Sequence, residues 1–118
     1  MISINEIIAI AEENGGITYN CVTGEINPPT GYAVSIEGRE FFAPDLDPAC
    51  LTGYIMSNTD CFSPTTFLGL WKNEETWSLD ITVVFSNIAM AMGAAERNNQ
   101  KAIYDFETKK CIYLNQTV

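Results

Sequence analysis

Between Trp77 and Phe85 every second residue is large and apolar, and Ser78, Asp80 and Thr82 occupy positions between them. A period of two residues is typical of a β-strand that turns one face to the core and the other to water. We therefore predict a central strand over residues 77–85, with Asp80 on its solvated side.

Two segments in the first half of the chain have helical patterns. The first covers residues 3–14, where Ser3 and Glu6 have the spacing of a capping box and apolar residues recur at helical intervals. The second covers about residues 48–57, because Asp47 followed by proline is a typical helix start. Both segments are therefore predicted to be helices.

A third helix is predicted to begin at a cap on Ser86 and to end at Asn98. Shorter apolar runs predict further strands, of which the first two form a hairpin with a long connection and the last two form a tight hairpin. These strands are residues 17–22, 32–36, 67–71, 102–106 and 110–114. The order is roughly αββ-αββ-αββ.

The length of 118 residues and the apolar content of 47% suit a single domain over residues 1–118. We predict an α+β fold with an antiparallel sheet of about five to six strands and two to three helices. The longest apolar runs fall well short of the roughly 20 residues that span a bilayer. No cation precedes Arg39 to begin a secretory signal, so we expect a protein of the bacterial cytoplasm.

Negative charge is distributed unevenly along the chain. Residues 1–71 carry a net charge of −8 and residues 72–118 carry −1, which gives −9 for the whole chain. This charge argues against direct contact with nucleic acid. The chain also has no histidine to serve as a base near neutral pH, so a hydrolytic triad is not expected. We predict a protein without catalysis, metal or cofactor.

The four cysteines form no Cys-x-x-Cys pair, and most have apolar or aromatic neighbours, so we expect buried thiols that fill core space. The carboxylates that could act in catalysis also have structural explanations. Asp47 is explained by helix capping, Asp45 by its loop, and Asp80 by its place on the polar side of a strand. We therefore assign no catalytic carboxylate.

Several aromatic residues lie in or beside two long loops that are also acidic or rich in proline. Most are expected in the core, but two exposed ones would form an apolar centre surrounded by carboxylates. Such a centre suits a basic protein surface, because carboxylates steer the encounter and aromatic rings supply buried area. The candidate partner-binding residues are Glu25, Tyr32, Glu37, Glu40, Phe41, Phe42, Asp45 and Asp47.

The segment from Glu96 to Asp105, with Ile112 behind it, resembles the ends of small acidic proteins carried by bacteriophages and mobile elements. That resemblance implies an anti-defence protein of the anti-CRISPR or antirestriction type. Such a protein would inhibit a basic host protein, such as a nuclease or CRISPR effector, by occupying its nucleic-acid groove.

Two other functions stay open. The first is a small-molecule-binding protein or enzyme, with a pocket between sheet and loops lined by Tyr32, Tyr54, Trp71 and Asp80. The second is a structural or assembly module that forms a symmetric oligomer through a sheet edge.

Overall fold

A computed structural model describes residues 1–114, and in this part of the chain it has three helices and seven strands. The α+β class is confirmed, with one strand more than the predicted maximum. In chain order the elements are α1 (Ile4–Asn14), β1 (Gly16–Tyr19), β2 (Tyr32–Ser35), β3 (Phe41–Ala43), α2 (Pro48–Ser57), β4 (Thr66–Asn73), β5 (Thr76–Phe85), α3 (Ile88–Arg97), β6 (Ala102–Asp105) and β7 (Lys110–Tyr113).

All seven strands form one antiparallel sheet organised around β5. The strand order is β1-β4-β5-β2-β6-β7, and β3 pairs with β5 beside β2. On that side of β5, β2 pairs with residues 82–85 and β3 pairs with residues 77–79. The predicted central strand is therefore confirmed as β5, and β2 and β3 pair end to end along one of its edges.

The predicted hairpin between residues 17–22 and 32–36 is wrong. β1 pairs with β4, whereas β2 pairs with β5 and β6. Both early strands therefore find their partners far away in the sequence, which a local pattern does not reveal. The sequence also does not predict β3, since three residues are too short to establish an alternation. The predicted C-terminal hairpin, β6 with β7, is confirmed.

Side-chain caps explain where the first two helices begin. The Ser3 hydroxyl accepts a hydrogen bond from the Glu6 backbone N–H at 3.2 Å, and the Glu6 carboxylate accepts one from the Ser3 N–H at 3.0 Å. The Asp47 carboxylate accepts a hydrogen bond from the Cys50 N–H at 2.8 Å. Each cap satisfies backbone donors that have no partner inside the helix. Both predicted helices are confirmed.

The third helix begins one residue later than predicted. Its cap is Asn87, whose side-chain oxygen accepts a hydrogen bond from the Met90 N–H at 3.1 Å, and not Ser86. The helix ends at Arg97, close to the predicted end. None of the helices in residues 1–114 has the length and apolar character needed to cross a bilayer.

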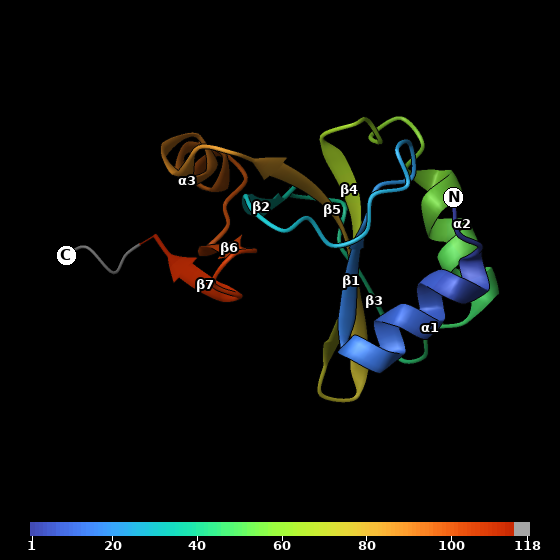
Figure 1. Ribbon diagram of the computed structural model, residues 1–118. Coiled ribbons are helices and arrows are strands. Elements are labelled where there is room, and N and C mark those ends of the chain that lie inside the picture. Colours follow the sequence, from blue (N-terminus) through green and yellow to red (C-terminus); the bar gives the residue numbers. More distant parts are fainter. Residues whose placement is uncertain (115–118) are drawn as a thin grey trace.

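All three helices pack on the same face of the sheet (Figure 1). α1 and α2 enclose the larger core with β1, β4 and β5, where Leu51, Leu70 and Leu79 are fully buried. α3 encloses a smaller core at the other end, which includes Val34 and Ile103. The opposite face of the sheet has no helix against it within the described residues.

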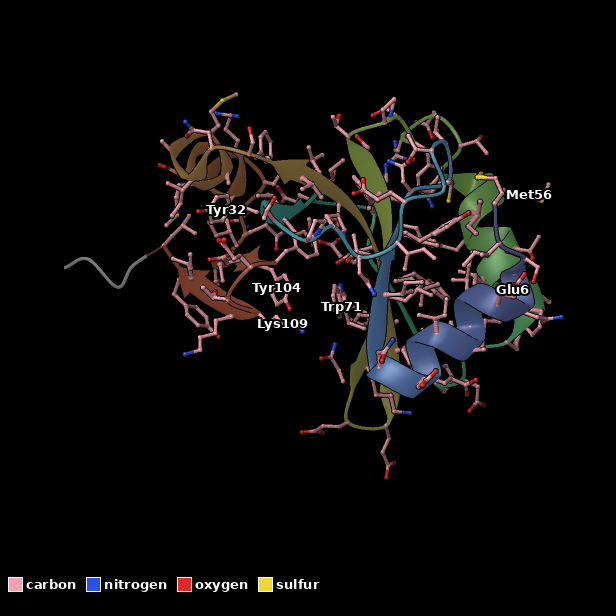
Figure 2. The ribbon with its side chains drawn as sticks, in the orientation of Figure 1. Glu6, Tyr32, Met56, Trp71, Tyr104 and Lys109 are labelled. Atoms are coloured by element: carbon pink, nitrogen blue, oxygen red, sulfur yellow. The ribbon has the colours of Figure 1, made fainter. Side chains whose placement is uncertain are left out.

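The face without helices is concave. Trp71 on β4 and Tyr104 on β6 point toward one another across it, with ring centroids 5.8 Å apart (Figure 2). β5 and β2 lie between these two strands in the sheet, so a flat sheet would separate β4 from β6 by about 14 Å. The sheet therefore bends around this face and brings side chains from distant strands together.

Candidate functional site

The candidate partner-binding residues divide between two places on the molecule. Tyr32 pairs with Phe85 and Phe41 pairs with Leu79, which places them about 20 Å apart along β5. Glu25 lies with Tyr32, and the other six residues lie in or beside β3. We call these six the β3 edge: Glu37, Glu40, Phe41, Phe42, Asp45 and Asp47.

Both phenylalanines of the β3 edge are solvent-exposed, Phe41 by 49% and Phe42 by 65%. As neighbours on a strand they point to opposite faces. Phe41 lines an open cavity of about 520 Å³ together with Cys50 and Tyr54 of α2. Within residues 1–114 β3 has a strand partner on one side only, so its outer backbone edge is free.

The carboxylates of the β3 edge form no ion pair within residues 1–114. Arg39 is the only cation in that part of the sequence, and its guanidinium binds Asp60 at 3.1 Å and Asn58 at 3.0 Å. This contact raises the pKa of Arg39 and lowers that of Asp60. It is the one ion pair found within residues 1–114. The carboxylates of the β3 edge are therefore available to an outside cation.

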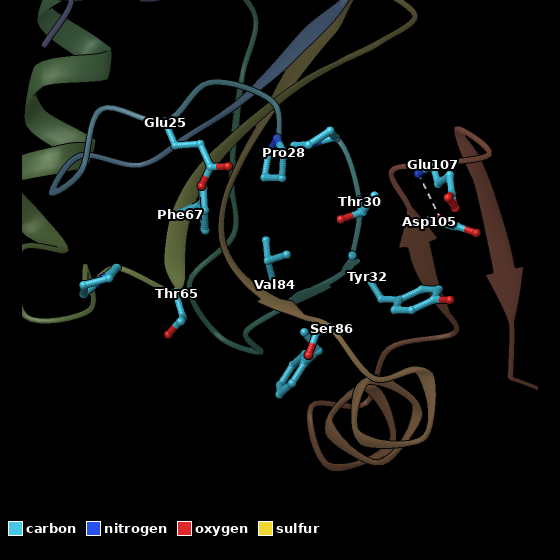
Figure 3. Close-up of a pocket in the computed structure, with 14 residues that line it drawn as sticks. Glu25, Pro28, Thr30, Tyr32, Thr65, Phe67, Val84, Ser86, Asp105 and Glu107 are labelled. Carbon is cyan, nitrogen blue, oxygen red and sulfur yellow. Dashed lines mark hydrogen bonds between the residues drawn. The ribbon is translucent and has the colours of Figure 1, made fainter.

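Glu25 and Tyr32 line a separate hollow of about 540 Å³ with Asp105 and Glu107 (Figure 3). The Glu107 N–H donates a hydrogen bond to the Asp105 carboxylate at 3.0 Å. The hollow is acidic, and no cation is among the described residues that line it. Residues 1–114 contain no group of three His, Cys, Asp or Glu side chains placed to hold a metal ion.

The prediction that water solvates Asp80 is wrong, because only 8% of this residue is exposed. Its carboxylate accepts hydrogen bonds from the hydroxyls of Ser35 and Thr82, both at 2.8 Å. Burial raises the pKa of Asp80, while the two hydroxyls act in the opposite direction and Glu40 adds to the increase. Asp80 is therefore a buried titratable group held in a fixed orientation.

Gly69 makes room for this carboxylate. It lies directly opposite Asp80 on β4, and a Cβ at this position would overlap the Asp80 Oδ1 atom. Thr18 of β1 pairs with Gly69 on the other side, which places all three residues on the concave face. Because Gly69 has no side chain, β4 leaves space for the Asp80 carboxylate at this position.

Asp80 lines a cavity of about 340 Å³ on the concave face. Ser35 and Thr82 lie beside it, and Trp71 and Tyr104 contribute aromatic rings. Of the four residues predicted to line a pocket, Trp71 and Asp80 therefore share one. Tyr32 lies in the hollow of Figure 3, and Tyr54 donates a hydrogen bond from α2 to the Arg39 carbonyl at 2.6 Å.

The prediction of four buried thiols is also wrong. Cys111 is exposed, and Cys21, Cys50 and Cys61 are half-buried against the larger core. Burial raises the pKa of the Cys21 thiol to about 11, which keeps it protonated and weakly nucleophilic near neutral pH. The half-buried cysteines thus contribute to packing at the margin of the core.

Thr18→Val should stabilise the protein by about 1 kcal/mol. Thr18 is fully buried, and its hydroxyl finds no hydrogen-bond partner among residues 1–114. Valine has nearly the same shape and removes that unsatisfied group. Urea denaturation measures the change, and a loss of stability would show that the hydroxyl has a partner in solution.

Comparisons with protein-family models, with curated proteins and with solved structures found no match. The function is therefore inferred from the residues and geometry of this chain.

Proposed function

We propose that the protein is a non-catalytic binding protein that attaches through the β3 edge to a basic surface of another protein and inhibits it. One observation carries this proposal. Phe41 and Phe42 are exposed on a strand with a free edge, and the carboxylates that flank them have no cationic partner within residues 1–114. Exposed aromatic residues are typical anchors of protein interfaces.

The unpaired charge favours a basic partner over a second copy of this chain. At a net charge of −9, two copies repel each other, whereas a surface rich in lysine and arginine is attracted. Carboxylates at the rim would accelerate the encounter, and the phenylalanine rings would supply the buried area. Binding should therefore weaken as salt is added.

The partner class that best fits this chemistry is a nucleic-acid-binding protein of a bacterial host, such as a defence nuclease or CRISPR effector. The grooves of such proteins present arginine and lysine to phosphates. The carboxylates of the β3 edge would occupy part of such a groove in place of nucleic acid. An extended segment of the partner can also pair with the free edge of β3, and its successive side chains, on opposite faces, would meet Phe41 and Phe42.

Removing four charges from the β3 edge should abolish partner capture. The variant E37Q/E40Q/D45N/D47N keeps the side-chain shapes, and asparagine preserves the cap of α2. Wild-type protein and variant are immobilised, exposed to a bacterial lysate and compared by quantitative mass spectrometry. We expect a basic nucleic-acid-binding protein on the wild type and at least a tenfold loss on the variant, which corresponds to about 1.4 kcal/mol.

The matched control is E12Q/E13Q/E96Q/E107Q, which removes the same number of exposed carboxylates elsewhere. This control should retain the captured protein. Equal capture by all three proteins would reject the proposal. A stable dimer in solution that F42A dissociates would instead favour the assembly module.

A further inference from the structure

Among the residues of the described chain that line the cavity on the concave face, one has an acidic carboxyl group, Asp80. The only other titratable side chains that line it are Tyr104 and Cys111, and no cation is among the described lining residues. The Asp80 carboxyl is thus buried and has no cationic partner in the part of the chain that the structure describes. A buried charge is costly unless an opposite charge or hydrogen bonds stabilise it.

The two hydroxyl groups next to Asp80 can each still accept a hydrogen bond. Ser35 and Thr82 each donate their proton to the carboxylate, so each hydroxyl oxygen keeps lone pairs that can accept a hydrogen bond. The carboxylate oxygens also keep acceptor capacity. An ammonium group has three donors and no acceptor, which complements this arrangement.

Aromatic rings form another wall of the same cavity. The rings of Trp71 and Tyr104 are tilted by 48° with centroids 5.8 Å apart, and Phe106 packs edge-on against Tyr104 at 5.2 Å. This packing restrains the Tyr104 ring. The faces of Trp and Tyr attract cations, and they also pack well against flat apolar groups.

We propose that the cavity on the concave face binds a small organic cation, a primary ammonium group attached to a compact aromatic or apolar group. The ammonium group contacts Asp80 and the two hydroxyl oxygens, and the apolar part packs against Trp71 and Tyr104. The volume of about 340 Å³ lies at the lower end of the range for ligand pockets, so the ligand is compact. This site is separate from the β3 edge and does not depend on the function proposed for it.

The net charge of the protein supports a cation over an anion. A bare metal ion fits less well, since the lining provides one carboxylate, and residues 1–114 hold no metal-binding group of three. A neutral apolar ligand would leave the charge of Asp80 without a partner. The charge of the ligand is therefore the property to test.

The test compares 2-phenylethylammonium with its neutral analogue 2-phenylethanol by isothermal titration calorimetry near pH 7.5. Chemical shifts of the Trp71 indole N–H, observed by NMR in the same titration, locate the binding. We expect saturable binding of the ammonium compound with a Kd below about 1 mM, and at least tenfold weaker binding of the alcohol. Equal affinity for both compounds, or no saturation by the ammonium compound, would overturn the proposal.

Variants separate this cavity from the acidic surface as a whole. D80N should weaken binding at least tenfold, and Y104A should weaken it as well. The matched control E13Q removes one exposed charge from α1 on the opposite side of the sheet and should bind like the wild type. Circular dichroism first establishes that each variant is folded. Unchanged affinity in D80N, or equal loss in E13Q, would contradict a specific site at Asp80.

Discussion

Gly69→Ala should destabilise the protein by about 1–3 kcal/mol, although a glycine inside a strand is ordinarily a weakness. The new methyl group would overlap the Asp80 Oδ1 atom and lie 3.2 Å from the Thr82 hydroxyl. The carboxylate would have to leave the hydrogen bonds that it accepts from Ser35 and Thr82. Urea denaturation of the wild type and the variant measures the loss.

Two further variants test the cause of this loss. Gly53→Ala is the matched control, because a Cβ at this exposed position in α2 meets no atom within 4 Å. It should stabilise the protein by about 0.5–1 kcal/mol. In a D80A background the cost of G69A should fall, since the overlapping carboxylate is gone. An equal cost in both backgrounds would show that the overlap with Asp80 does not cause the loss.

Asp80→Asn should stabilise the protein at neutral pH by about 1–3 kcal/mol. The pKa of Asp80 lies above its ordinary value of 3.8 in the folded protein, so folding favours the protonated carboxyl. The stability linked to that proton is fully present below the ordinary pKa and is lost as the pH rises through the folded pKa. Asparagine is never charged, yet it can still hydrogen-bond both hydroxyls.

The free energy of unfolding is measured for wild type and D80N near pH 7.5 and near pH 3. The advantage of D80N should be largest at the higher pH and should shrink toward zero at the lower one, because the lower pH lies below the ordinary pKa of 3.8 and the wild-type carboxyl is then mostly protonated in both states. Taking the difference cancels the titration of the other carboxylates. A D80N variant that is less stable than wild type at pH 7.5 would show that hydrogen bonds to the charged carboxylate outweigh its burial.

Local patterns in the sequence identify most of the elements. The alternation around Leu79 predicts β5, the capping box at Ser3 predicts α1, and Asp47 with Pro48 predicts α2. The errors concern pairing. β1 and β2 are joined to strands about fifty residues later, and no local feature of their sequences indicates this.

The environment of Asp80 could not be predicted from its strand alone. Alternation places the polar residues of β5 on the face away from the helices, and such a face is normally open to water. Here the sheet bends until Trp71 and Tyr104 meet above it, so this face is also largely closed. The signal that could have indicated this is the glycine at position 69, which interrupts an apolar strand where its neighbour needs space.

The sequence predicts Phe41 and Phe42 as candidate partner-binding residues, but it does not show whether their side chains are exposed. Two adjacent aromatic residues on a strand must point to opposite faces, so an interior strand would bury at least one of them. Both are exposed because β3 is short and lies at an edge of the sheet. The position of a strand in the sheet is a tertiary property that composition does not encode.

The pairing of the first three strands with later ones sets an order for folding during synthesis. Among the described residues, β1, β2 and β3 have no strand to join until the β4–β5 hairpin has been translated, when more than half of the chain has been synthesised. That hairpin is itself a local structure that can form quickly. The apolar segments that become β1 and β2, which contain Ile17 and Val34, therefore cannot pair in the sheet until β4 and β5 have been synthesised.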